Sequence, residues 1–145
     1  MKYEIVQLSE KIVAGFSGVT SNTDPKMQEI IGGLWAKLYA GNKPYDVKNR
    51  VNAYAIGLYS DYKEDQYTVT AGFEVSKPEN EELTVKVIPA GTYAKFSITG
   101  TMEDVAKAWN EIWNTDLDRS YTGDFEEYLN SDMEHAKIDI YIALK

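Results

Sequence analysis

Two adjacent carboxylates, Glu126 and Glu127, lie among aromatic residues in the stretch Asp124–Tyr128. If this stretch is a β-strand, its side chains alternate between two faces, and Glu126 shares a face with Tyr128 while Glu127 does not. A carboxylate removed from water and flanked by rings suits an organic cation, because charge pairing and cation–π attraction act together. Alternation alone leaves open which glutamate faces a groove, and a surface carboxylate on a half-exposed edge strand is the simpler alternative.

Four further residues are candidates for the same ligand-binding site. Tyr141 lies on the strand predicted to follow, within cross-strand reach of Tyr128. Trp35 and Trp113 occupy equivalent places in the two half-units described below, where they could border a groove. Glu74 alternates away from its apolar neighbours and is a second candidate carboxylate.

Metal-, histidine- and nucleotide-dependent chemistry have little support in the sequence. His135 is the only histidine and the chain has no cysteine, so soft ligands for a metal site are lacking. Gly32 and Gly33 lie inside a predicted helix without the residues of a phosphate loop. We expect these glycines to mark a close contact between that helix and a sheet, and we expect no cofactor and no bound metal.

The acidic charge is concentrated in the second part of the chain. Of the formal net charge of −8, residues 1–100 contribute −1 and residues 101–145 contribute −7. No basic face is available to displace the counterions of phosphates, so we expect no direct nucleic-acid binding. A cationic partner stays open, but an acidic surface that only confers solubility is the favoured explanation. Glu4 interrupts any leader and no apolar run approaches a membrane span, so we expect a cytoplasmic protein without membrane contact.

Two segments have the apolar spacing of amphipathic helices. The first follows Asp24 and Pro25, a helix-capping pair, and presents one apolar face up to Leu38, with Gly41 and Pro44 as its stop signals. The second covers 102–113, with Thr101 as its N-cap residue and Asp104 completing an approximate capping box. Trp109 in this second helix is expected to fill the core, as large aromatics at helical spacing usually do.

The other periodic stretches alternate with period two and predict strands. They cover residues 3–8, 11–18, 51–60, 66–76, 83–88, 91–99, 124–130 and 137–144. The resulting order is ββαββ followed by ββαββ. Ile5 to Phe16 and Val85 to Phe96 have the same separation, so the pattern predicts one unit used twice. We expect a single α+β domain over 1–145 with halves of about 1–76 and 83–145, antiparallel sheets, both helices on one side and a ligand groove on the other.

Several segments in this order resemble the GyrI-like small-molecule-binding family, the effector-binding domain also found at the C-terminus of AraC-type and MerR-type bacterial transcription activators. The resemblance covers the whole chain. The segments that carry it are Tyr3–Gly15, Leu34-Trp35, Tyr67–Val75, Ile88–Phe96, Trp109–Trp113, Asp124–Tyr128 and Ile138–Ile142.

The resemblance implies two SHS2-like halves and an aromatic groove around a central glutamate that binds lipophilic, often cationic, compounds. The position of the Phe-Glu-x-Tyr pattern makes Glu126 that glutamate. The final strand departs from the family by carrying Tyr141 and Ala143 where Trp and Pro are usual. No helix-turn-helix precedes residue 1, so we expect a stand-alone form.

Three functions are compatible with this reading. The first is a stand-alone effector or multidrug-binding protein that acts in transcriptional regulation or drug sequestration. The second is a cofactor-independent hydrolase of strained or electrophilic compounds, because some family members are similar to such enzymes; Glu126 would activate water, and Tyr128 or Tyr141 would be the acid. The third is a protein-binding module similar to the gyrase-inhibiting members.

Overall fold

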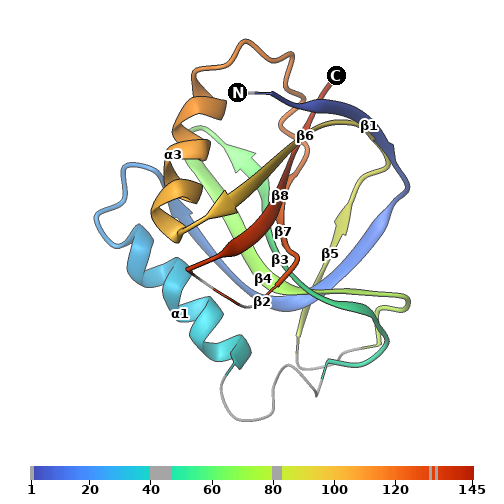
Figure 1. Ribbon diagram of the computed structural model, residues 1–145. Coiled ribbons are helices and arrows are strands. Elements are labelled where there is room, and N and C mark those ends of the chain that lie inside the picture. Colours follow the sequence, from blue (N-terminus) through green and yellow to red (C-terminus); the bar gives the residue numbers. More distant parts are fainter. Residues whose placement is uncertain (1, 40–46, 80–82, 131, 133) are drawn as a thin grey trace.

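The computed structural model describes residues 2–39, 47–79, 83–130, 132 and 134–145. Its elements follow the predicted order of two ββαββ units (Figure 1). The first unit contains β1 (Glu4–Leu8), β2 (Lys11–Ser21), α1 (Met27–Tyr39), β3 (Arg50–Lys63) and β4 (Gln66–Val75). The second contains β5 (Thr84–Ile88), β6 (Gly91–Gly100), α3 (Met102–Trp113), β7 (Asp124–Tyr128) and β8 (Ala136–Ala143). This confirms the predicted α+β fold.

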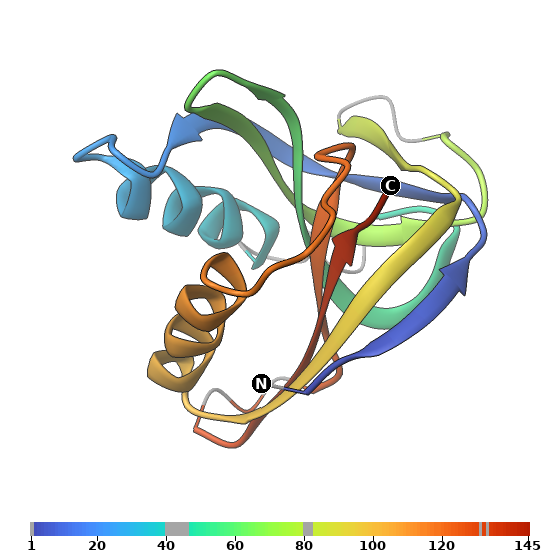
Figure 2. The ribbon, with the colours of Figure 1, turned by 90° about the horizontal axis from the view of Figure 1, so that it is seen from above.

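The ten elements that the structure describes form one layered arrangement of a curled sheet and two helices (Figure 2). The strands form an antiparallel sheet in the order β1-β6-β8-β7-β3-β4-β2-β5. Each unit gives its first strand to the other: β1 pairs with β6, and β5 pairs with β2. The two units are therefore joined at the centre by β3 and β7 and also at both edges of the sheet.

The two units are related by a pseudo-twofold axis between β3 and β7, where Gly57 is paired with Glu126. The hydrogen bonds repeat across this axis. In β2 and β4, the hydroxyl groups of Ser17 and Thr70 are 2.7 Å apart, and in β6 and β8 the Ser97 hydroxyl donates to Asp139 Oδ1 over the same distance. The predicted ββαββ pattern thus appears twice in the structure, with one pair of corresponding side-chain hydrogen bonds.

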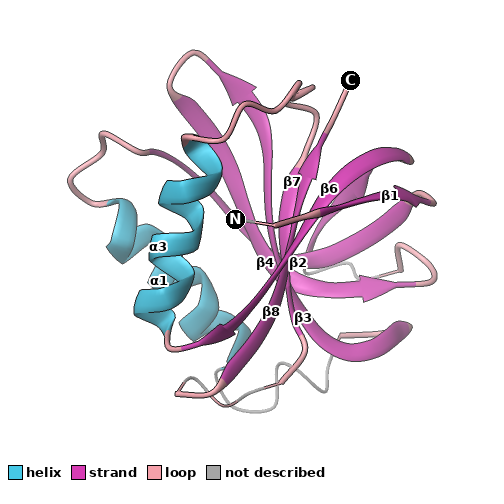
Figure 3. Ribbon diagram, turned by 45° about the horizontal axis from the view of Figure 1, so that its top comes forward, coloured by secondary structure: helices cyan, strands magenta, loops and turns pink. Residues whose placement is uncertain are grey.

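Both helices lie on the same side of the sheet, as predicted (Figure 3). α1 packs Leu34 and Leu38 against β2 and β4, and Gly18 of β2 lies under the helix, where a Cβ would make only ordinary van der Waals contact with Ile30 and Leu34. The predicted contact at Gly32 and Gly33 is wrong, since a Cβ on either would meet nothing within 4 Å.

The helix ends agree with the capping residues. The Asp24 carboxylate accepts from the backbone N–H of Lys26 at 2.8 Å, and Thr101 and Asp104 form the predicted capping box of α3. The predicted stop at Gly41 and Pro44 lies outside the described residues. Strands β2 and β3 run three residues further than predicted, to Ser21 and Lys63, and β7 ends two residues earlier.

The face of the sheet away from the helices is also packed. An apolar cluster there includes Ile56 and Leu58 of β3, Tyr93 of β6, and Phe125 and Tyr141, all of which are buried. The predicted groove on this face is therefore wrong: the curl of the sheet closes the face around its own side chains, and the open space lies on the helix side.

The helices are too short and too polar to cross a membrane: none within the described part of the chain has a long enough apolar run.

Candidate functional site

A cavity of about 510 Å³ lies between α1, α3 and the hairpin that joins β3 to β4. Both helices contribute to it, with Met27 and Ile31 from α1 and Trp109 and Trp113 from α3. The strands, turns and loops contribute aromatic and charged residues. Its other described lining residues are Asn22, Thr23, Tyr59, Tyr62, Glu64, Asp65, Gln66, Tyr67, Ala106, Arg119 and Tyr121. A volume of this size suits a small organic molecule.

Glu126 lies immediately behind the aromatic wall of this cavity. Only 4% of the residue is exposed, and its carboxylate accepts three hydrogen bonds from uncharged donors. Trp109 Nε1 donates to Oε2 at 2.8 Å, while the hydroxyl groups of Tyr128 and Tyr59 donate to Oε1 at 3.2 and 3.4 Å. Since Tyr59 and Trp109 also line the cavity, their rings separate the carboxylate from the open space.

Space for the carboxylate comes from a glycine on the neighbouring strand. Gly57 pairs with Glu126 across β3 and β7, and a Cβ at position 57 would lie 3.0 Å from Glu126 Oε1 and 3.2 Å from Trp35 Cζ2. Real Cβ atoms seldom approach other atoms this closely, so a side chain here would displace either group. Gly57 therefore belongs to the site although it donates nothing to it.

Burial dominates the electrostatics of Glu126. It raises the pKa of the carboxyl group, and the three hydrogen bonds offset part of this effect. In the described part of the chain no cationic side chain pairs with this carboxylate. Burial, followed by the charge of Glu126, raises the pKa of Tyr59 and Tyr128 well above that of a free phenol, so both remain hydrogen-bond donors at neutral pH.

A second carboxylate, Asp124, is buried near the same cavity but is paired with a cation. It accepts from Arg119 Nη2 at 2.6 Å, from the Tyr62 hydroxyl at 2.6 Å and from the backbone N–H of Ala143 at 2.8 Å. Arg119 and Tyr62 both line the cavity, whereas Asp124 itself is 0% exposed. The cavity thus adjoins one neutralised carboxylate and one that carries no counter-ion in the described chain.

Three predicted site residues lie on the helix side of the sheet: Trp113 lines the cavity, whereas Tyr128 and Trp35 lie near Glu126 outside the cavity lining. Tyr128 contacts the carboxylate, and Trp35 packs edge-on against Tyr128 with ring centroids 5.2 Å apart. Trp113 lines the cavity and is 53% exposed. The predicted equivalence of Trp35 and Trp113 is wrong by one helical turn, because the ring that packs edge-on against Tyr59, at 5.4 Å, is Trp109.

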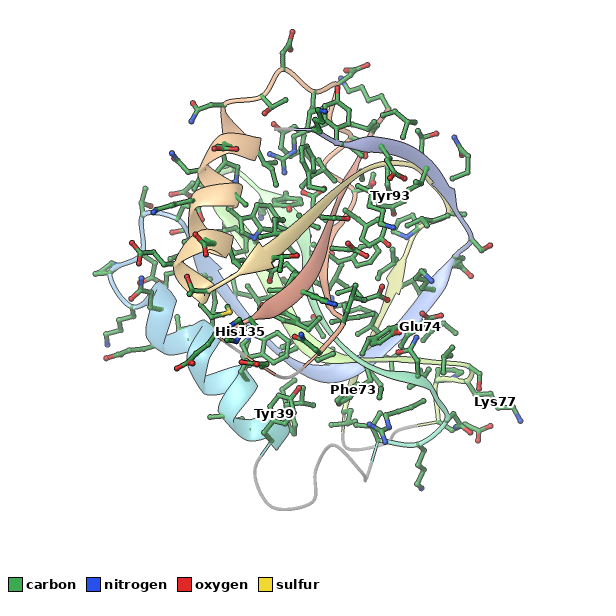
Figure 4. All side chains as sticks on the ribbon, in the orientation of Figure 1. Tyr39, Phe73, Glu74, Lys77, Tyr93 and His135 are labelled. Atoms are coloured by element: carbon green, nitrogen blue, oxygen red, sulfur yellow. The ribbon has the colours of Figure 1, made fainter. Side chains whose placement is uncertain are left out.

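The other predicted residues lie on the opposite face of the sheet, where the structure does not bring them to Glu126. Glu74 forms an ion pair with Lys11 at 3.2 Å, and Tyr141 stacks on Phe125 with centroids 4.5 Å apart. In Figure 4, Glu74 lies on the side away from the helices. Glu127 shares this face because of strand alternation, so it is Glu126 that faces the helices.

Several residues of the site were not predicted. Trp109 is half-buried and packs against the core that it was expected to fill, but it also lines the cavity and its indole N–H donates to Glu126. Tyr59 shares a face with Gly57 in β3, and the repeat could have revealed it as the counterpart of Tyr128. Arg119 lies in an irregular segment whose sequence has no periodicity.

His135 lies in an exposed turn, where its Nδ1 is 3.3 Å from Asp132 Oδ2.

Comparison with known proteins identifies relatives along the whole chain. A DNA gyrase inhibitor from Yersinia enterocolitica is 29% identical over 140 residues, which cover 92% of this chain and 80% of that protein. An integron cassette protein from the mobile metagenome of Vibrio cholerae is 31% identical, with a TM-score of 0.81 over 99% of this chain and 95% of the other.

A third protein, solved with tetraphenylphosphonium bound, has the same fold. Its TM-score is 0.82 over 100% of this chain and 94% of its own, at 16% identity. The model of the GyrI-like small molecule binding domain matches residues 1–145. The chain therefore belongs to the family of GyrI-like small-molecule-binding domains, as its sequence motifs indicated.

Proposed function

We propose that this protein binds lipophilic organic cations in the cavity between α1 and α3. The observation that carries the proposal is the state of Glu126, a buried carboxylate held by three neutral donors behind an aromatic wall. A cation in the cavity would contact the faces of Tyr59 and Trp109 and would sense the negative charge immediately behind them. Binding of tetraphenylphosphonium by a protein of the same fold supports this choice of ligand.

In this proposal the protein acts as an effector-binding or sequestering module. The hydrolase alternative has less support, because Tyr59 and Trp109 stand between Glu126 and the cavity. A general base must come within hydrogen-bond reach of the reacting group, and that would require these rings to move. Cation binding to the rings needs no such movement. Mass spectrometry of recovered ligand distinguishes the two: turnover would favour the hydrolase.

The test is a calorimetric titration with tetraphenylphosphonium. We expect saturable 1:1 binding to the wild type, and binding to Glu126→Gln weakened about tenfold or more, because the variant loses the charge but keeps the shape. Glu127→Gln is the matched control: it removes the same charge from the next residue, on the opposite face, and should bind like the wild type. Equal affinities of the wild type and Glu126→Gln would refute the proposal.

A further inference from the structure

Arg119 is fixed in place at the wall of the cavity. Its Nη2 donates to the buried Asp124 carboxylate, and its Cζ lies 4.4 Å from the centroid of the Tyr121 ring. The Tyr62 hydroxyl donates to the same carboxylate oxygen. Only 15% of the arginine side chain is exposed. A guanidinium group held in this way presents its remaining donors in fixed directions.

One of those donors is unused. Arg119 Nε is buried and has no hydrogen-bond acceptor within the described part of the chain, and it is the one buried side-chain polar atom there in that condition. Buried donors without a partner are rare because they lose hydration and gain nothing in return. Since Arg119 also lines the cavity, a ligand is a natural source of the missing acceptor.

The surrounding charges indicate what kind of acceptor would fit. Asp124 already neutralises the guanidinium, and Glu64 and Asp65 add negative charge to the cavity lining. An anionic group on the ligand would be repelled by these carboxylates, whereas a neutral carbonyl oxygen would not. The Tyr121 ring, which is 55% exposed, packs over the guanidinium, so the aromatic part of a ligand could lie beside this ring while a carbonyl oxygen approaches Nε.

We propose that Arg119 Nε recognises a neutral oxygen of the ligand, so that the preferred ligands are lipophilic cations carrying an ester, amide or ketone group. This inference rests on the proposed function and adds a second recognition point to it. Tetraphenylphosphonium, which has no oxygen, would use only the aromatic part of the site.

Two matched probes test the inference: heptyltriphenylphosphonium and (4-ethoxy-4-oxobutyl)triphenylphosphonium, which have the same charge and chain length and differ in the ester. The quantity measured is the ratio of their affinities, ester over heptyl. We expect this ratio to fall about tenfold in Arg119→Lys, which keeps a cation for Asp124 but lacks Nε. Arg50→Lys is the matched control and should keep the wild-type ratio, because Arg50 packs over Phe73 and does not line the cavity.

An NMR measurement on the wild type avoids any effect of substitution on folding. The sequence has two arginines, Arg50 and Arg119, so two side-chain Nε–Hε signals are expected. The ester probe should shift the Arg119 signal downfield, the heptyl probe should not, and the Arg50 signal should stay in place.

The outcomes separate this inference from the proposed function. If both probes bind but the ratio is unchanged in Arg119→Lys, or the Arg119 signal does not respond to the ester, the inference is wrong and the proposed function stands. If neither probe binds the wild type, both fail. Tighter binding of (3-carboxypropyl)triphenylphosphonium than of the ester would also overturn the preference for a neutral oxygen.

Discussion

The central strands of the two units, β3 and β7, occupy matching positions, but β3 carries small uncharged residues where β7 carries carboxylates. Across the pseudo-twofold axis, Ala55 and Gly57 of β3 correspond to Asp124 and Glu126 of β7. The second unit therefore supplies the two buried carboxylates next to the cavity, and the first supplies the space that Glu126 occupies. The duplicated scaffold keeps its geometry when one copy loses these side chains and the other gains charges, so one site can form at the centre of a symmetric fold.

The aromatic residues around the axis are more nearly equal. Trp35 packs edge-on against Tyr128, and Trp109 packs edge-on against Tyr59 in the same manner. The difference is that the rings of Trp109 and Tyr59 line the described cavity, whereas those of Trp35 and Tyr128 do not. Similar pairs of rings thus have different surroundings, and the substitutions below test how much of that difference affects stability and binding.

The largest effect is expected at Asp124. Its replacement by Ala, the residue at the matching position of β3, would leave Arg119 and Tyr62 without their buried acceptor. Breaking a buried ion pair from one side costs about 3–5 kcal/mol, so the free energy of unfolding in urea should fall by about that amount. Asp118→Ala, which removes an exposed partner of Lys145, is the control and should unfold like the wild type. A small loss in Asp124→Ala would show that the pair contributes little.

The next largest effect is expected at Gly57. Gly57→Ala places a Cβ against Glu126 Oε1 and Trp35, and overpacking of this kind costs about 1–3 kcal/mol. Gly33→Ala is the matched control, because a Cβ there meets nothing and an exposed helical glycine gains about 0.5–1 kcal/mol on becoming alanine. Thermal unfolding should move in opposite directions for the two variants. A stabilised Gly57→Ala protein would contradict the close contact.

A third comparison concerns the two tryptophans. Trp109→Phe removes the indole donor to Glu126 and a ring face of the cavity, so tetraphenylphosphonium should bind about five- to tenfold more weakly. Trp35→Phe changes the equivalent ring outside the cavity and should alter affinity less than about twofold. Near-UV circular dichroism checks that both variants are folded. Equal losses in the two would mean that the units bind the ligand alike.

The smallest effect is a dependence of stability on pH, since hydrogen bonds offset part of the burial of Glu126. Burial raises the pKa of the Glu126 carboxyl group in the folded protein above its ordinary value in the unfolded chain. Between the two pKa values the folded protein therefore holds a proton that the unfolded chain has released. The unfolding free energy of the wild type should therefore rise, relative to Glu126→Gln, as pH falls through this window. Urea titrations of both proteins from pH 7 to 5 measure the difference. A difference independent of pH would mean that Glu126 has an ordinary pKa.

Sequence periodicity predicts the elements and the repeat well because both depend on local spacing. The capping box at Thr101 and the alternation that separates Glu126 from Glu127 follow from positions a few residues apart. The repeat follows from the equal spacing of apolar residues within the strand pairs that end near Phe16 and Phe96. Such patterns assign residues to faces of an element. They also brought Glu126 and Tyr128 together correctly as neighbours on one strand.

The position of the cavity could not be predicted in the same way. Both faces of the sheet are apolar, so alternation did not show which face the open space would adjoin. The prediction therefore placed Glu126 and Tyr128 on the side away from the helices and grouped them wrongly with Glu74 and Tyr141. The Trp109 indole looks like any other core residue in a helical pattern. Arg119 reaches Asp124 because of the path that the irregular segment before β7 follows, and the spacing of residues in the sequence does not specify that path.

The exchange of β1 and β5 also sets an order of assembly. As the chain is synthesised from its N-terminus, strand β4 can pair with β2 and β3 early, and α1 can pack against them. Strand β1, in contrast, has no strand to pair with until Gly91–Lys95 has been made. Contacts so distant in sequence are slow to form. Strand β1 thus docks only after β6 has been made, and until then β6 has an uncovered edge open to a strand of another newly made copy.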